Sequence, residues 1–322
     1  MQYTLLGRTG VTVSRICFGT MSFGSDADEA TSSAMFNRCL DAGVNFFDTA
    51  NSYTHGRSEE ILGRLIQGKR DQLVITSKVC SAMGPGPNDR GLSRRHIMLQ
   101  VENTLRRLQT DRLDLYFVHH FDAKTPIEET LRALDDLVTQ GKILYPGASN
   151  WAAWQVAKAL GVSHHNGWAR FECIQPMYSL VKRQAEVEIL PLAQSEQVGV
   201  ISYSPLGGGM LTGKYVAGKP EEGRFLTNAM YQKRYQDQIY ADTAARFSQY
   251  AGENGVHPAT LAVAWVLAHP AITAPIIGAR NVQQLEASLA AADFPLDLEQ
   301  YAEISGFSYE PPPATDRSEE RS

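Results

Sequence analysis

The sequence predicts an α/β protein with the (β/α)8 barrel fold, the TIM barrel, and three observations support this. Eight short apolar segments alternate with amphipathic segments of helical length along the 322 residues. The apolar segments have no polar face, as is typical of parallel strands covered on both sides. The length suits one barrel of about 250 residues with additions. A doubly wound sheet with a second domain is the alternative, but no G-x-G-x-x-G motif follows an early strand.

The predicted strands are short and rich in β-branched and aromatic residues. In chain order they cover residues 16–19, 45–47, 73–76, 113–118, 143–147, 171–174, 198–203 and 275–277. The predicted helices have apolar residues at the helical period. They cover residues 28–42, 58–67, 93–109, 127–140, 152–160, 185–197, 238–252 and 282–291.

Segments outside these units complete the predicted organisation. Residues 3–6 and 11–14 flank a glycine-bounded turn, which predicts a hairpin that plugs one end of the barrel. Residues 206–236 form the longest irregular stretch, which we interpret as a functional loop. We therefore expect one barrel domain over residues 1–309 and a disordered tail over residues 310–322, which is rich in proline and charge.

Composition and charge exclude several classes of protein. Hydrophobic residues make up 43% and charged residues 20%, which is typical of a globular chain. A net charge of −5 argues against a nucleic-acid partner. No apolar run reaches the roughly 18 residues that span a bilayer, and no signal peptide is evident, so we expect a cytoplasmic protein without a membrane partner. The cysteines lack zinc-ligand spacing and are expected to be reduced and mostly buried: Cys17, Cys39, Cys80 and Cys173.

Polar side chains stand at the ends of three consecutive predicted strands, where active sites of such barrels are built. Asp48 ends the second strand and Tyr53 follows in the next loop. Lys78 ends the third strand, and His119 ends the fourth. Each residue alone has an ordinary structural explanation, such as a helix cap or a solvated lysine. Their coincidence at successive strand ends predicts one site.

The chemistry that suits these residues is proton delivery to a carbonyl oxygen. A lysine cation beside a tyrosine stabilises its phenolate, which brings the pKa of the tyrosine down from about 10 toward a usable range. An aspartate can hold that lysine, and a neutral imidazole can orient the substrate oxygen. Strand alternation separates His119 from His120 but does not decide which of them faces the site.

Short motifs along nearly the whole chain resemble one family. They are Asp48-Thr-Ala-x-x-Tyr53, Gly56-x-Ser58-Glu-Glu60, Ser77-Lys78, Asp114-Leu-Tyr-x-x-His119, Gly141-Lys-Ile, Ser149-Asn150, Gln175-x-x-Tyr178, Tyr203-Ser-Pro-Leu206, Ile277-Gly-Ala-Arg280 and Gln284-Leu285. In these motifs the chain resembles the aldo-keto reductase superfamily, in the branch related to potassium-channel β subunits. The resemblance implies a (β/α)8 barrel that reduces an aldehyde or ketone with NADPH, the hydride coming from the nicotinamide.

The resemblance also implies roles for individual residues. The family's catalytic tetrad falls on Asp48, Tyr53, Lys78 and His119, with Tyr53 as the acid, which selects His119 over His120. We expect His120 to point away from the site. Metal ligands are not implied.

The cofactor residues implied by the resemblance run from the first strand to the last helix. Thr20 and Met21 would lie against the nicotinamide ribose, and Asp48 lies beside them. The carboxamide would be held by Ser149, Asn150 and Gln175, with Tyr203 stacked on the ring. The phosphates and adenosine would be held by residues of two loops: Ser204, Pro205, Leu206, Gly208, Lys214, Arg224, Gly278, Arg280, Gln284 and Ser288. Many relatives have asparagine where this chain has Ser288.

Two other functions remain as alternatives. A barrel lyase could use Lys78 as a Schiff-base nucleophile. A non-catalytic potassium-channel β subunit would bind the nucleotide and act mainly as a partner, although the barrel begins almost at Met1 and we expect no inactivation-type segment. Substrate choice in this fold depends on loops, here residues 81–92, 121–125 and 206–236.

Overall fold

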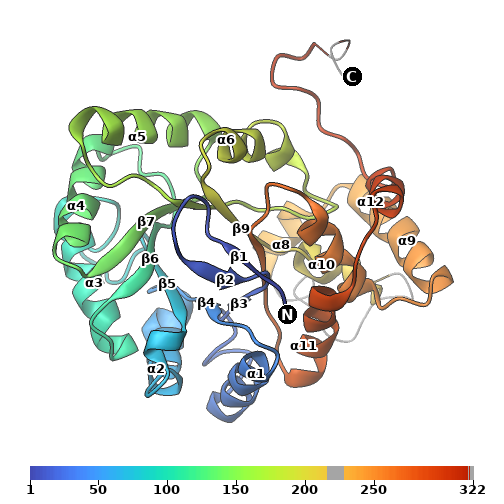
Figure 1. Ribbon diagram of the computed structural model, residues 1–322, viewed down its shortest axis with the longest axis horizontal. Coiled ribbons are helices and arrows are strands. Elements are labelled where there is room, and N and C mark those ends of the chain that lie inside the picture. The colour runs from blue at the N-terminus through green and yellow to red at the C-terminus, as the bar shows by residue number, and fades with distance from the viewer. Residues whose placement is uncertain (216–227, 318, 320–322) are drawn as a thin grey trace.

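The computed structural model describes residues 1–215, 228–317 and 319, and its centre is a closed barrel of parallel strands (Figure 1). The strands follow one another around the barrel in chain order, and the last pairs with the first. They are β3 (Cys17–Gly19), β4 (Phe46–Asp48), β5 (Val74–Val79), β6 (Leu113–Val118), β7 (Ile143–Ser149), β8 (Cys173–Gln175), β9 (Gly199–Tyr203) and β10 (Ala274–Ile277). The predicted (β/α)8 barrel is confirmed, and each predicted strand overlaps one of these.

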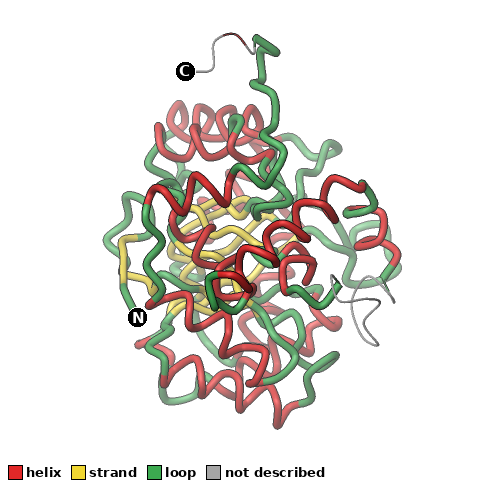
Figure 2. The backbone as a smooth tube through the Cα atoms, turned by 90° about the vertical axis from the view of Figure 1, so that its right-hand side faces the viewer, coloured by secondary structure: helices red, strands yellow, loops and turns green. Residues whose placement is uncertain are grey.

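Helices surround the strands on the outside of the barrel (Figure 2). They are α1 (Glu29–Asp41), α2 (Arg57–Leu65), α3 (Arg94–Leu108), α4 (Ile127–Thr139), α5 (Ala153–Asn166), α6 (Ile189–Ser195), α8 (Ala229–Arg234), α9 (Gln238–Glu253), α10 (Pro258–Ala268), α11 (Val282–Leu289) and α12 (Leu298–Ser305). Apolar side chains of the helices and outward side chains of the strands together form one large core. Side-chain caps start several of them; the Asp28 carboxylate, for example, accepts from the backbone N–H of Thr31 at 2.8 Å ahead of α1.

A hairpin of β1 (Tyr3–Leu5) and β2 (Thr12–Ser14) lies across the end of the barrel that faces the viewer in Figure 1. Leu6 and Val13 belong to the apolar cluster inside the barrel, with Cys17 and Phe46. The predicted hairpin plug is confirmed. It closes the N-terminal end of the barrel and leaves the opposite end for a site.

The helix α10 was not predicted, and the reason is its composition. Eight of its eleven residues are buried, so it has no polar face and no helical period to detect. Within the stretch interpreted as a loop, the structure also contains α8, which begins after the Asn228 cap. The predicted helix over residues 185–197 is shorter, because α6 begins only at Ile189 after a short 3-10 turn.

Strand alternation inside the barrel carries the polar side chains to its open end. Phe46, Val74 and Phe117 belong to the inner apolar cluster. Residues an even number of positions further along each strand point the same way. These are Asp48, Lys78 and His119, so His119 and not His120 continues the inner face.

The four cysteines are unpaired, as expected, and all but Cys80 are buried. In the described part of the chain, no helix combines the length and apolarity needed to cross a membrane.

Candidate active site

A cavity of about 700 Å³ opens at the C-terminal ends of the strands, and most of the predicted site residues line it. Those that do are Met21, Asp48, Tyr53, His119, Ser149, Asn150, Gln175, Tyr203, Ser204, Pro205, Leu206, Gly208, Lys214, Gly278, Arg280 and Gln284. Thr20, Lys78 and Ser288 do not line it; they are buried. Arg224 lies outside the described residues.

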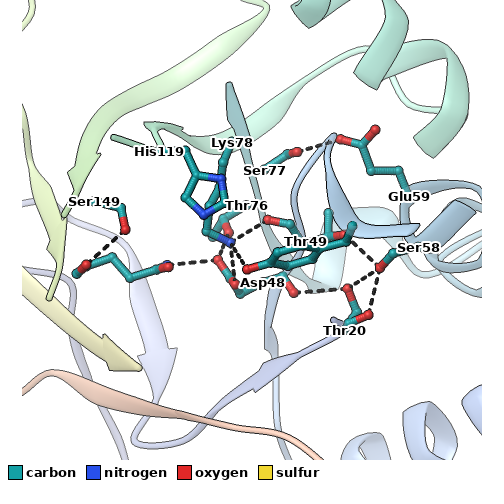
Figure 3. A network of polar contacts seen from close by, with 12 residues as sticks. Thr20, Asp48, Thr49, Ser58, Glu59, Thr76, Ser77, Lys78, His119 and Ser149 are labelled. Atoms are coloured by element: carbon teal, nitrogen blue, oxygen red, sulfur yellow. Dashed lines mark hydrogen bonds and ion pairs between the residues drawn. The ribbon is translucent and has the colours of Figure 1, made fainter. Parts of the chain in front are cut away.

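The ammonium group of Lys78 lies behind the cavity wall and has three acceptors (Figure 3). Its Nζ donates to Asp48 Oδ2 at 2.6 Å, to the backbone carbonyl of Thr49 at 2.6 Å and to the Tyr53 hydroxyl at 3.1 Å. A lysine ammonium has three N–H donors, so this set satisfies all of them. The side chain is fully buried, and the charge is stable there because of these contacts.

The Asp48 carboxylate joins three strands. Its second oxygen, Oδ1, accepts from Thr76 Oγ1 at 2.7 Å and from Gln175 Nε2 at 3.0 Å. An ionised carboxylate can accept about four hydrogen bonds, and Asp48 accepts three from side chains inside the barrel. Asp48 is therefore held in one orientation, which in turn holds Lys78.

Thr20 is buried behind the cavity wall and is held by side-chain and backbone contacts. Its hydroxyl lies 2.8 Å from that of Ser58 and 3.1 Å from the backbone carbonyl of Asp48. The Ser58 hydroxyl also lies 3.0 Å from that of Thr49 (Figure 3). These contacts tie the start of α2 to the ends of β3 and β4, and so position the segment that carries Tyr53.

A buried carboxylate on α2 reinforces this arrangement. Glu59 is fully buried and accepts from Ser77 Oγ at 2.5 Å and from Arg107 Nε at 2.6 Å. Ser77 precedes Lys78 on β5, and Arg107 lies on α3. The pair with Arg107 compensates the charge of Glu59, which would be costly to bury alone.

Burial and neighbouring charges set the protonation states of the central pair. Burial opposes the charge of Lys78, but Asp48 and Tyr53 together raise the pKa of the lysine above its ordinary value. Burial raises the pKa of Tyr53, and the opposing effect of Lys78 is smaller. The prediction of a lowered tyrosine pKa is therefore wrong, because desolvation outweighs the lysine. Tyr53 holds its proton and Lys78 its charge at neutral pH.

His119 faces Tyr53 across the cavity, with 6.1 Å between the ring centroids. Burial lowers its pKa well below the ordinary value, and Lys78 lowers it further, so the imidazole is neutral at pH 7. The prediction that His120 points away is wrong. His120 also lines the cavity and stacks on His119, with centroids 4.6 Å apart and planes 6° from parallel.

The strand ends after β7 and β9 are joined by side-chain contacts. The Tyr203 hydroxyl donates to Asn150 Oδ1 at 2.6 Å, and Asn150 Nδ2 donates to Ser149 Oγ and to the backbone carbonyl of His119, both at 3.0 Å. Asn150 and Ser204 have left-handed φ values of 57° and 61°. Such backbone is strained for residues other than glycine, and strain of this kind is concentrated at functional sites.

The model of the Aldo/keto reductase family matches residues 15–308. The chain belongs to the aldo/keto reductase family. It is similar to a Bacillus subtilis (strain 168) protein named Uncharacterized oxidoreductase YrpG, with 42% identity over 93% of each chain. It is also similar to a Probable voltage-gated potassium channel subunit beta of Arabidopsis thaliana, at 37% identity over 91% of this chain and 92% of the relative, and to Aldo-keto reductase YhdN of the same Bacillus strain, at 36% over 95% and 93%. The family makes this chain an oxidoreductase.

Arg280, the cation expected after the last strand, lines the cavity of this aldo/keto reductase and has an acidic neighbour. Arg280 Nε lies 3.4 Å from Asp26 Oδ2. The backbone N–H of Gln284 at the start of α11 donates to the Asn281 cap at 2.9 Å, and that of Arg280 to Gln284 Oε1 at 3.2 Å. These two backbone donors are therefore already engaged within the chain.

Three further residues of this aldo/keto reductase line the cavity and were missed by the sequence analysis: Met230, Tyr231 and Arg234, all on α8. The sequence contains two features that favour this helix, but they cover only a few residues. Asn228 is a favourable N-cap, and Tyr231 and Tyr235 stand one turn apart on one face.

Proposed function

We propose that this chain reduces the carbonyl group of an aldehyde or ketone to an alcohol with NADPH, and that Tyr53 is the proton donor. The observation that carries the proposal is the fully buried ammonium of Lys78, which donates to the hydroxyl of a tyrosine that faces the cavity. Asp48 and Thr49 fix this ammonium in place.

Each residue of this group has a physical role in the proposed reaction. As negative charge develops on the carbonyl oxygen, that oxygen becomes a stronger base than a phenolate and takes the proton from Tyr53. The Lys78 cation stabilises the phenolate that remains, and Asp48 keeps the lysine charged. The neutral imidazole of His119 can hydrogen-bond the same oxygen and orient it. The raised pKa of Tyr53 suits this role, because the acid must arrive protonated.

The chemistry of the cavity fits a nicotinamide nucleotide. Amide side chains and an aromatic ring line the reacting end, at Asn150, Gln175 and Tyr203, where a carboxamide and a planar ring would be held. Two cations, Lys214 and Arg280, line the cavity where phosphates would lie. When bound, NADPH supplies the hydride to the carbonyl carbon.

The glycine loop after β9 also suits close approach of such a ligand. Gly208 has a φ of +68°, and a Cβ atom there would lie 2.8 Å from the Tyr231 ring. The remaining residues that the resemblance assigns to the cofactor, including Met21, Gly278, Gln284 and the buried Thr20 and Ser288, stay part of this proposal.

Two alternatives have weaker support. A Schiff-base lyase needs a neutral amine, but all three donors of Lys78 are engaged and its pKa is raised. The name of the Arabidopsis relative suggests a channel subunit, which would use the barrel as a nucleotide-binding partner. We favour the reductase because Lys78 donates to the hydroxyl of Tyr53, which lines the cavity, and this contact supports a proton-donating role for the tyrosine.

The test is an absorbance assay of nicotinamide oxidation with the purified chain, a panel of aldehydes and ketones, and NADPH or NADH. We expect carbonyl-dependent oxidation of NADPH and formation of the corresponding alcohol. Tight nucleotide binding without turnover of any carbonyl would favour the partner function instead.

A further inference from the structure

A cationic side chain, Arg234, lines the cavity and has no acidic partner among the residues that the structure describes. Arg234, the last residue of α8, lines the same cavity as Tyr53 and His119. Its guanidinium lies 5.4 Å from the centre of the Tyr231 ring, and its Nη2 lies 3.6 Å from Met230 Sδ. These contacts hold the group in place with neutral partners. Among residues 1–215, 228–317 and 319, no carboxylate forms an ion pair with Arg234.

The charges of the cavity leave Arg234 available for an anion. Asp48 is the only acidic side chain among the described lining residues, and it is bound to Lys78. Arg280 has Asp26 beside it, and together with Lys214 it is assigned above to the phosphates of the nucleotide. Arg234 is therefore the cation that the proposed cofactor site does not use.

Tyr203 lines the cavity together with Arg234 and is linked by contacts to the reacting groups. The Tyr203 hydroxyl is bound to Asn150, which is bound in turn to the backbone of His119. Burial raises the pKa of this hydroxyl to about 12; the Arg234 guanidinium counteracts the rise and Tyr53 adds to it. Arg234, Tyr53 and Tyr203 line the same cavity, and the charges of Arg234 and Tyr53 both influence the Tyr203 hydroxyl.

We propose that Arg234 binds a carboxylate carried by the carbonyl substrate, so that acidic aldehydes or ketones are the preferred substrates. The inference rests on the proposed reductase function. A guanidinium matches a carboxylate with two parallel N–H donors, and a single cation balances a single negative charge. Partial burial among Tyr231 and Met230 strengthens this contact, because water competes less for it.

The test compares 4-carboxybenzaldehyde with its methyl ester, which has the same reacting aldehyde and no charge. Wild type, Arg234→Gln, Arg234→Lys and Lys233→Gln are assayed for kcat/KM with both compounds. Lys233 is the matched control, because it is the neighbouring cation on α8 but is exposed and does not line the cavity. We expect wild type to prefer the acid, and Arg234→Gln to lose about 10- to 100-fold on the acid with little change on the ester. Arg234→Lys should retain part of the preference, and Lys233→Gln all of it.

Binding measurements separate this inference from the proposed function. Both compounds are titrated calorimetrically onto the protein saturated with NADP⁺, where no reduction occurs, and NADPH affinity is measured for each variant. A preference for the acid that disappears in Arg234→Gln, with NADPH affinity unchanged, supports the role of Arg234 even if turnover is absent. Equal losses for acid and ester, a weakened NADPH affinity, or a wild-type preference for the ester would overturn it.

Discussion

The ammonium of Lys78 lies 3.1 Å from the hydroxyl of Tyr53, and the lysine side chain has no exposed surface. Because burial is costly for a lone charge, this lysine depends on Asp48 at 2.6 Å, and Asp48 depends on it. Substitutions in this group should therefore change both the stability of the fold and the rate of carbonyl reduction.

Replacing one member of the Lys78–Asp48 pair should cost both stability and activity. Lys78→Met leaves the Asp48 carboxylate buried without its cation, so we expect the free energy of unfolding to fall by about 3–5 kcal/mol. The double variant Lys78→Met/Asp48→Asn should recover part of that stability but none of the reductase activity. Urea unfolding and NADPH oxidation of the wild type and the two variants measure the two effects separately. Equal stability of the single and double variants would contradict the paired burial.

The directions of the pKa shifts predict a flat pH profile for reduction. Tyr53 and Lys78 have raised pKa values, and His119 has one well below its usual 6.5. None of the three therefore changes protonation between about pH 7 and 9, and the rate of reduction should stay constant across this range. The kcat measured across this range tests it. A clear inflection near pH 7 that disappears in His119→Gln would show that the histidine titrates there.

Gly147 on β7 should tolerate no side chain. A Cβ atom there would lie 2.5 Å from Cε1 of Phe117, inside the barrel. We expect Gly147→Ala to destabilise the fold by about 1–3 kcal/mol. Gly161→Ala on α5, where nothing lies within 4 Å of the added atom, is the control and should be neutral or stabilising by about 0.5–1 kcal/mol. Urea unfolding measures the stability of both variants. Similar stabilities would contradict this prediction, because they would show that the barrel interior accommodates the added methyl group.

Because Arg280 and Asp26 form an ion pair, substitutions of the two residues should have opposite effects on NADPH binding. If Arg280 binds the 2′-phosphate, Arg280→Gln should weaken NADPH by about 10- to 100-fold and NADH much less. Asp26→Asn removes the group that competes with the phosphate, and should tighten NADPH binding. We expect a gain of only about threefold, because the pair is partly exposed.

Dissociation constants of both nucleotides, measured by fluorescence, test this pair of variants. Equal losses for NADPH and NADH in Arg280→Gln would remove this arginine from the phosphate site. Weaker NADPH binding in Asp26→Asn would mean that Asp26 positions Arg280 and does not compete with the ligand.

The sequence predicted the barrel because its strands carry a distinct pattern. Each strand is a short apolar run, and polar residues such as Asp48 and Lys78 follow on the inner face at the open end. The pattern fails for α10, whose residues are buried on all sides and show no period. It also fails at the end of α5, which continues beyond the predicted end at residue 160 to Asn166.

Many of the residues that line the candidate site could be predicted from the sequence, but the shifts of their pKa values could not. The strand ends identified Tyr53 and Lys78 as neighbours, yet the direction of the tyrosine pKa depends on burial, which a single sequence does not reveal. Arg234 was missed because it lies on a helix of six residues within a stretch interpreted as a loop. The partner of Arg280 was missed as well, since Asp26 belongs to a different loop.

The most direct test of the account is the rate of carbonyl reduction by Tyr53→Phe, with NADPH affinity measured on the same sample. Phenylalanine keeps the ring beside His119 and Lys78 but has no proton to donate. We predict a loss of at least about 100-fold in kcat with the dissociation constant of NADPH nearly unchanged. A Tyr53→Phe enzyme that retained most of its kcat would contradict the central claim that Tyr53 delivers the proton.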